Sequence, residues 1–253
     1  MSNGVKINSM KFRRQLFKYI DADGAKSMLS EATLQFSNSS DFNDPFDCHP
    51  SLIDFSVGPN GRGGDYVMNN VRKRSEEEHN RLRNNTWICS LSKINDSLLM
   101  WSHYANSHKG VCVELNMAHA CICIGKQRYG RIIHNMGVEV QYKDIIERPK
   151  YFKREKDFVN YQISTKSKDW EYEQEWRLYI VDPVQCYVDK KKNKVYPKLT
   201  GECFEAIYLG AKISEKDKKE IIRLARKLNN HIKIYQMSIN ADAFKLDVSD
   251  EIY

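Results

Sequence analysis

The segment at residues 170–181, WEYEQEWRLYIV, constrains the fold more than any other part of the chain. Three glutamates, Glu171, Glu173 and Glu175, are spaced two apart and are followed by Arg177. Because successive side chains of a β-strand point to opposite faces, this spacing predicts a strand that carries the carboxylates and Arg177 on one face. The aromatic and aliphatic residues between them are expected to pack on the other face.

Two other interpretations of this segment stay open. Glu173 and Arg177 are four residues apart, which also suits an ion pair on a helix. Alternatively, the acidic row lies on a solvent-exposed sheet face and is neutralised by Lys166, Lys168 and Arg177. The aromatic and β-branched residues favour the strand over the helix. A row of like charges raises carboxylate pKa values unless cations or a ligand compensate, so the segment is a candidate functional surface.

Short apolar runs with a few unevenly placed helical patterns predict an α+β fold, unlike the regular alternation of a doubly wound parallel sheet. We expect a single domain over residues 1–253, with a mixed, mostly antiparallel β core built as one sheet or two small sheets, and several peripheral helices. The predicted strands are 17–20, 33–36, 87–92, 111–115, 138–142, 206–209 and 232–235, with a hairpin of 186–188 and 195–196. The predicted helices are 25–31, 66–83, 98–104 (capped by Asp96), 152–164 and 214–229.

Composition indicates a soluble globular protein, and its net charge makes an anionic partner easier to bind without establishing one. The chain has 41% hydrophobic residues and a net charge of +7, which favours a phosphate-bearing ligand or RNA. Seven cysteines without an export signal argue against a disulfide framework, and their spacing predicts no metal site. No apolar stretch approaches the roughly 18 residues that span a bilayer, so we expect a cytoplasmic protein with no membrane partner. The sequence leaves the oligomeric state open.

Four segments together resemble a bacterial family described as domain of unknown function 2971. They are FS at 36–37 with FNDPFD at 42–47, CSLS at 89–92, MWSHY at 100–104 with HKGV at 108–111, and the stretch from Lys166 to Arg177. YLG at 208–210 also fits, and the resemblance extends over about residues 17–235. Members of this family look like toxins or antiviral-defence effectors, and the resemblance extends that expectation to this chain.

The order of the segments is also similar to that of ADP-ribosyltransferases, in which a basic residue, a serine and a glutamate line a cleft for NAD. The resemblance implies that NAD is the substrate, that Glu175 is the catalytic carboxylate and that Glu173 supports it. Ser90 or Ser92 would be the serine, and Arg177 would also bind the nucleotide. A carboxylate suits this reaction because cleavage of the nicotinamide bond develops positive charge on the ribose.

The basic residue of the first strand departs from the pattern of those transferases. Lys18, next to Tyr19, occupies the matching position, whereas the family usually has arginine or histidine there. Arg13 and Arg14 are close enough in sequence to be alternatives. The resemblance therefore implies Lys18 and Tyr19 as nucleotide contacts, with the identity of the basic residue left open.

Asn43, Asp44 and Asp47 form a second polar cluster, with Pro45 in a turn between them. One interpretation is a structural turn anchored in the core by Phe42 and Phe46. The other is that a rigid turn presents Asn43 and Asp44 to a ligand.

Trp101 and Tyr104 are three residues apart and are predicted to share one face of a helix. A core stripe is one interpretation, and an aromatic edge that stacks on a base or nicotinamide is the other. His103, between them, is a candidate acid or base without a visible partner.

Three functions are therefore considered. The first is an NAD-using ADP-ribosyltransferase-like enzyme with a nucleic acid or protein acceptor. The second is a Mg²⁺-dependent nuclease in which Asp44, Asp47, Glu173 and Glu175 converge on the metal. The third is a non-catalytic nucleotide-binding sensor that uses the same cleft. Phosphate-binding and dinucleotide-binding glycine motifs are absent from the sequence, which disfavours kinases and dehydrogenases of the common types.

Overall fold

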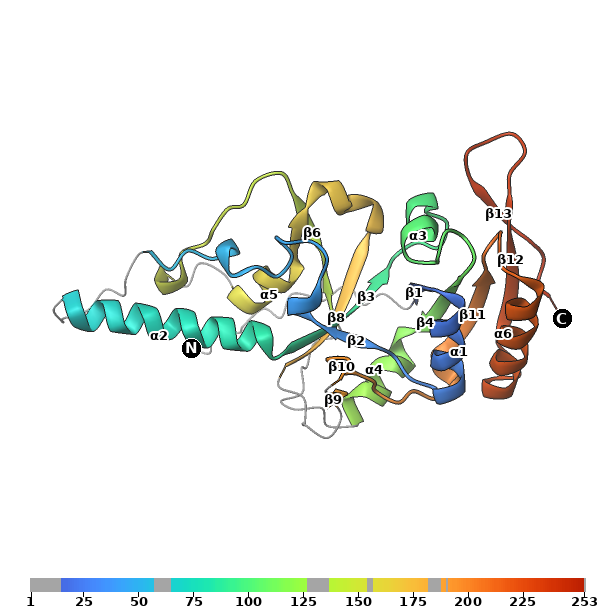
Figure 1. The fold of residues 1–253 in the computed structure, drawn as a ribbon, viewed down its shortest axis with the longest axis horizontal. Coiled ribbons are helices and arrows are strands. Elements are labelled where there is room, and N and C mark those ends of the chain that lie inside the picture. Colours follow the sequence, from blue (N-terminus) through green and yellow to red (C-terminus); the bar gives the residue numbers. More distant parts are fainter. Residues whose placement is uncertain are drawn as a thin grey trace, which may run out of the picture.

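Among the described residues, eleven strands form one large sheet (Figure 1). The computed structural model describes residues 15–56, 65–126, 137–153, 157–181, 188–189 and 191–252. The sheet order is β13-β12-β11-β4-β1-β3-β2-β10-β9, and β8 pairs with β3 and β5. The strands are β1 (Gln15–Ile20), β2 (Phe36–Asn38), β3 (Thr86–Ser92), β4 (Val111–Asn116), β5 (Val138–Glu139), β8 (Glu175–Val181), β9 (Val188–Asp189), β10 (Lys194–Val195), β11 (Phe204–Leu209), β12 (Lys233–Ile239) and β13 (Leu246–Val248).

Antiparallel pairing dominates this sheet, as the sequence predicted. The exception within it is β11 with β12, which are parallel and joined by helix α6 (Glu215–Leu228). A separate parallel pair is formed by β6 (Gln141–Lys143) and β7 (Thr165–Ser167). The mixed α+β fold is therefore confirmed, with one large sheet and one small sheet.

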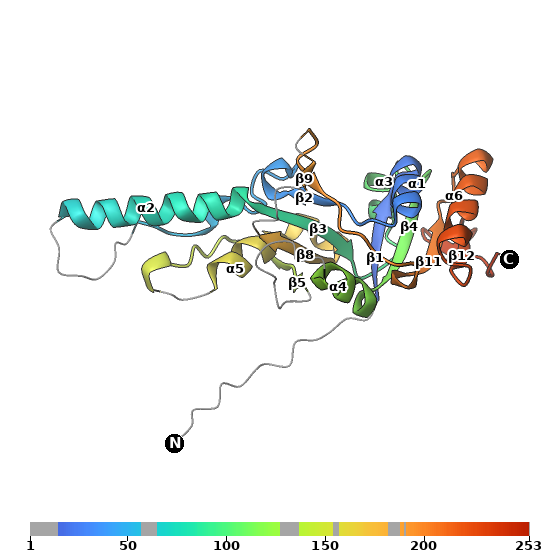
Figure 2. The same cartoon turned by 90° about the horizontal axis from the view of Figure 1, so that it is seen from below.

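The helices cover the two faces of the sheet unequally (Figures 1 and 2). On one face, α1, α4 and α6 pack on alternate residues of β1, β4, β11 and β12 in the largest apolar core. On the opposite face, α3 packs its Trp101 against Tyr19, Cys112 and Met237. Helix α2 extends away from the sheet. The remaining helices are α1 (Ala22–Glu31), α2 (Asp65–Asn84), α3 (Leu98–His103), α4 (Met117–Lys126) and α5 (Phe158–Ser164), with 3₁₀ turns η1 (Ser39–Asp41), η2 (Pro50–Leu52), η3 (Tyr151–Lys153), η4 (Lys168–Glu173) and η6 (Gly201–Cys203).

Side-chain caps fix where the main helices begin. The side chains of Asp21 and Ser214 accept hydrogen bonds from the backbone of the first turns of α1 and α6. Ser97, not Asp96 as predicted, caps α3 by accepting from the Met100 N–H at 3.4 Å. Within the described ranges, no helix is long and apolar enough to cross a membrane.

Three predicted elements differ from the structure. The strand predicted at 138–142 is divided between β5, which pairs with β8, and β6, which pairs with β7. The strand predicted at 33–36 begins only at Phe36, and Thr33 makes an isolated bridge outside it. The helix predicted at 152–164 is η3 followed by α5, and residues 154–156 lie outside the described ranges.

The predicted acidic strand is also shorter than expected. Residues Lys168–Glu173 form η4, which the Ser167 side chain caps. Gln174 then adopts a left-handed conformation with φ of 43°, and β8 begins at Glu175. Local turn chemistry therefore overrides the alternation in the first half of the segment. Only Glu175 and Arg177 share a buried strand face, and Glu171 is exposed.

Candidate functional site

A pocket opens where the large sheet divides. On one edge of β3, the end near Trp87 pairs with β2 and the end at Ser92 meets β1. Among the described strands, none pairs with the middle of β3 on that edge, and the pocket lies there with a volume of about 190 Å³. Its lining comprises Phe17, Lys18, Tyr19, Phe42, Asn43, Asp47, Ser90, Leu91, Ser92, Met100, Tyr104, Lys166, Glu173, Glu175 and Arg177.

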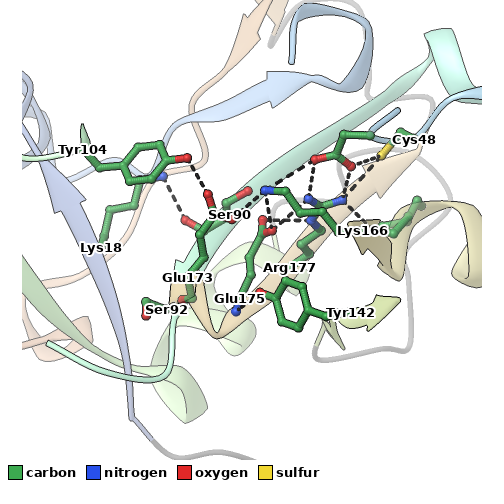
Figure 3. Close-up of polar contacts among 12 residues, drawn as sticks. Lys18, Cys48, Ser90, Ser92, Tyr104, Tyr142, Lys166, Glu173, Glu175 and Arg177 are labelled. Carbon is green, nitrogen blue, oxygen red and sulfur yellow. Dashed lines mark hydrogen bonds and ion pairs between the residues drawn. The ribbon is translucent and has the colours of Figure 1, made fainter. Parts of the chain in front are cut away.

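Arg177 is the centre of the buried charge cluster beneath this pocket (Figure 3). Its guanidinium donates to Glu175 from Nε and Nη2, both at 2.8 Å, and to Asp47 from Nη1 and Nη2 at 2.7 and 2.6 Å. Nη1 also donates to the Ile163 carbonyl at 2.7 Å. All five guanidinium N–H groups thus have an acceptor, which fixes the two carboxylates on either side of the arginine.

Lys166, on β7, links this cluster to Glu173. Its Nζ donates to Glu173 Oε2 at 2.5 Å and lies 3.4 Å from Glu175 Oε2 and 3.8 Å from Asp47 Oδ2. The other oxygen of Glu173 accepts from the Tyr104 hydroxyl at 2.5 Å. Glu173 is therefore held between a cation below and a phenol at the pocket wall.

The cluster contains more carboxylates than cations. Among the described residues, Asp47, Glu173 and Glu175 have two cations within ion-pair distance, Lys166 and Arg177, so full ionisation leaves one net negative charge. All five side chains are buried. An uncompensated charge in a buried site is costly, and either a proton or a cationic ligand relieves it.

The two glutamates respond to this environment in opposite directions. Burial tends to raise the pKa of Glu175, but the charges of Arg177 and then Lys166 outweigh burial and lower the pKa to about 2. For Glu173, burial raises the pKa and the Lys166 charge only partly opposes it. Glu175 is therefore the more acidic of the two glutamates, and Glu173 is the one that is more readily protonated.

The two serines of β3 have different surroundings. Ser90 lines the pocket, its side chain stabilises the Glu175 carboxylate, and its carbonyl accepts from Lys18 Nζ at 2.9 Å. Ser92 is buried, and its hydroxyl donates to the Glu173 carbonyl at 2.7 Å. Lys18 thus satisfies the Ser90 carbonyl, a backbone acceptor that the division of the sheet leaves without a partner among the described strands. The alternative basic residues, Arg13 and Arg14, lie outside the described residues.

The structure separates the two residues of the polar turn. Asn43 is exposed and lines the pocket. Asp44 is buried, does not line it, and accepts from the Phe46 N–H at 2.9 Å. Phe42 lies 5.5 Å from the Arg177 guanidinium carbon, but Phe46 is 56% exposed and is not the predicted core anchor.

The aromatic residues predicted on one helix face have different positions. Tyr104 lines the pocket, whereas Trp101 is fully buried and donates from Nε1 to the Asn95 carbonyl at 2.8 Å. Its ring packs edge-on against Tyr19, whose own side chain also borders the pocket. Trp101 is therefore a core residue. His103 is exposed and does not line the pocket.

Sequence reasoning missed two contributors to the site. Lys166 was considered only as a neutralising surface charge, yet it is buried among all three carboxylates. Tyr142, on β6, accepts from the Glu175 N–H at 2.8 Å and so fixes the start of β8. The position of Lys166 within the segment shared with the family was a usable signal, but for Tyr142 the sequence offered none.

Within the described part of the chain, no group of three or more histidine, cysteine, aspartate or glutamate side chains is arranged to hold a metal ion. Of the four carboxylates considered for Mg²⁺, Asp47 and Glu175 bind opposite sides of Arg177, and Asp44 lies apart from the pocket. The oxygens of Asp47 and Glu175 face the cationic side chain of Arg177.

Comparison with known proteins gives one match. No curated protein and no solved structure matches the chain. Residues 100–178 match the model of a family described as a protein of unknown function, DUF2971. The matched region runs from Met100, at the pocket wall, to the residue after Arg177, and it includes Tyr104, Lys166 and both glutamates of the cluster. This match supports the resemblance to the DUF2971 family over residues 100–178.

Proposed function

We propose that the pocket binds the nicotinamide end of NAD and that the protein is an ADP-ribosyltransferase-like enzyme. The observation that carries this proposal is the excess negative charge of the buried cluster, which faces the pocket at Glu173. The nicotinamide ring of NAD is a flat cation. A pocket with a carboxylate and the rings of Phe17 and Tyr104 on its walls suits such a ring by charge and by stacking.

The size of the pocket agrees with a partial enclosure of the ligand. A volume of about 190 Å³ is below the roughly 300–1,000 Å³ of pockets that enclose drug-sized ligands. It suits a ring and part of its ribose, with the rest of the molecule outside. Lys18 and the exposed Asn43 are the candidate contacts for the phosphates and the second ribose.

The chemistry assigned to the cluster is electrostatic. When the bond between the nicotinamide nitrogen and the ribose carbon breaks, its electron pair stays on nicotinamide and positive charge develops on the ribose. The fixed anion of Glu175 stabilises that charge, and no reorganisation is needed because Arg177 already holds the carboxylate in place. Glu173 accepts the proton that the acceptor nucleophile loses as the new bond to the ribose forms.

One observation favours the alternative of a non-catalytic nucleotide sensor. Both oxygens of Glu175 are bound by Arg177, and both oxygens of Glu173 are bound by Tyr104 or Lys166. A sensor needs only this rigid geometry, whereas a transferase requires Tyr104 or Lys166 to release Glu173 to the substrate. The magnesium nuclease receives less support, because its carboxylates are engaged with cationic side chains.

Release of nicotinamide tests the proposal. Purified protein is incubated with NAD, and nicotinamide is quantified by chromatography beside Glu175→Gln and Glu173→Gln variants. Glu171→Gln is the matched control, since Glu171 is exposed two residues away. We expect both cluster variants to lose at least about 100-fold in rate, in the range of other electrostatic stabilisers, and the control to keep its rate. NAD binding without release would favour the sensor, and RNA cleavage that requires Mg²⁺ would refute both.

A further inference from the structure

Part of the sheet face opposite α1 and α6 is hollowed in the described part of the chain. On this face α3 packs over the end around Tyr19, Cys112 and Met237. The rest is a groove of about 600 Å³ that crosses β1, β4, β11 and β12. The strand register places Phe17 opposite Glu114, and Tyr208 opposite Tyr235.

Aromatic rings form one wall of this groove. Tyr208 and Tyr235 are stacked, with ring centroids 5.1 Å apart and an interplanar angle of 21°. Phe17 meets Tyr208 edge-on at 6.2 Å. The Tyr208 hydroxyl donates to Glu114 Oε2 at 2.9 Å, which fixes its ring. Three rigid rings half-exposed to solvent provide a surface on which a flat or cationic group can stack.

Carboxylates form the floor and rim of the groove. Glu114 is buried, and Glu205 accepts from Asn116 Nδ2 at 2.6 Å and from Gln15 Nε2 at 3.1 Å. Glu202 is exposed at the rim, and against these three acids the lining offers one lysine, Lys233, and one histidine. The chain as a whole carries a net charge of +7, so the groove is opposite in sign to the protein around it.

We propose that this groove binds a polypeptide segment through a basic side chain. A guanidinium or ammonium group stacks on the tyrosine pair while the carboxylates accept its hydrogen bonds, and the phosphates of a nucleic acid are repelled. The occupant is a polypeptide and not a small cation because the groove extends across four strands, about 14 Å at the usual strand spacing. That length suits an extended segment on either side of the basic residue.

The groove is adjacent to the pocket. Phe17 lines both, so the docked basic side chain lies next to the pocket. This makes the docked segment the acceptor of the transferred group, a step that rests on the proposed function. Docking itself does not, and it is measured without NAD.

Fluorescence anisotropy of labelled synthetic peptides tests the docking. The peptides are identical except for a central arginine, lysine or citrulline, the last being a neutral counterpart of arginine. We expect the arginine and lysine peptides to bind, and citrulline to weaken binding about 10-fold. Glu205→Gln and Tyr235→Leu should each weaken binding of the basic peptides by a similar factor, whereas Asp250→Asn, an exposed carboxylate outside the groove, should not.

The same experiment distinguishes a polypeptide from other ligands of the groove, namely small cations and nucleic acid. The proposal would be overturned if the citrulline peptide bound as tightly as the arginine peptide. It would also be overturned if the two groove variants bound the basic peptides as tightly as the unsubstituted protein does. Displacement by spermidine at the peptide's own concentration would identify a site for small cations, and groove-dependent binding of an RNA oligonucleotide would identify a nucleic-acid surface. Unfolding midpoints of the variants show that they are folded. The binding assay contains no NAD, so its result is independent of the nicotinamide-release assay. Either experiment can fail while the other succeeds.

Discussion

Replacement of Arg177 with methionine tests whether one guanidinium holds the buried charge cluster together. Arg177 is fully buried and bridges Asp47 and Glu175 through four hydrogen bonds of 2.6–2.8 Å. Methionine keeps much of the apolar bulk but leaves two buried carboxylates with Lys166 as their remaining cation. Removing one partner of a buried ion pair costs about 3–5 kcal/mol, so we expect the free energy of unfolding at pH 7 to fall by that amount.

The loss should depend on pH in a defined direction. Arg177 and Lys166 lower the pKa of Glu175 from an ordinary value of 4.5 to about 2 against the opposing effect of burial. A lowered carboxyl pKa stabilises the fold above the unfolded pKa, and this contribution is lost as the pH falls through the folded pKa. The difference between the ordinary and the lowered pKa of Glu175 corresponds to roughly 3 kcal/mol of folding free energy. In the Arg177→Met variant, Glu175 is protonated at a higher pH than in the unsubstituted protein. The difference in free energy of unfolding between the two proteins should therefore be largest at neutral pH and should narrow below about pH 4.

Urea unfolding followed by tryptophan fluorescence at neutral and acidic pH measures both effects. Arg223→Met is the control, because Arg223 pairs with Glu220 on the exposed surface of α6 and its loss should leave the unfolding midpoint unchanged. Adding Glu175→Gln to Arg177→Met should recover part of the stability, since one uncompensated charge is then removed. A loss in Arg177→Met no larger than in the control, or one that does not narrow in acid, would refute the reasoning.

Two further predictions concern a backbone contact and the ionisation of Glu173. Gly110→Ala should destabilise the fold by about 1–3 kcal/mol, because its Cβ would lie 2.2 Å from the Ile20 carbonyl oxygen. Gly24→Ala meets mainly the flexible Ile20 side chain and should cost less, and equal melting temperatures for the two variants would contradict this account. If the proposed function holds, NAD binding should release a proton and tighten as the pH rises, because burial raises the pKa of Glu173 and a cationic ring favours its ionised form. Calorimetry in two buffers of different ionisation enthalpy measures this release, which Glu173→Gln should abolish; a pH-independent affinity in the unsubstituted protein would contradict it.

Local patterns in the sequence were sufficient to predict much of the fold. Strands β3, β4 and β11 are short apolar runs bounded by polar or turn residues, and each was predicted within a few residues. Helix α6 begins at Glu215, directly after its cap Ser214 and within one residue of the predicted start. The failures occur where a local turn competes with a periodic pattern, as at Ser167 and Gln174, which convert the predicted acidic strand into a 3₁₀ turn and a kink.

The site was predictable only in its list of candidates. Lys18, Ser90, Tyr104 and both glutamates do line one pocket. Their roles depend on contacts that no local pattern contains: Arg177 meets Asp47 across 130 residues of chain, and Lys18 bonds a carbonyl that is available only because β1 and β2 divide one edge of β3. Trp101 and Asp44 are buried and do not line this pocket, and the sequence does not show which edge of a helix or turn faces the core.

The kink at Gln174 explains why the two glutamates of the cluster are not equivalent. In the continuous strand that the alternation predicts, Glu173 and Glu175 would share one face and face similar surroundings. Instead the left-handed Gln174 ends η4 before β8 begins, so Glu175 lies in the strand beside Arg177 while Glu173 reaches Tyr104 at the pocket wall. One carboxylate is consequently a fixed anion and the other has a raised pKa. Two carboxyl groups whose pKa values move apart can divide the work between charge stabilisation and proton transfer, which two equivalent glutamates could not do.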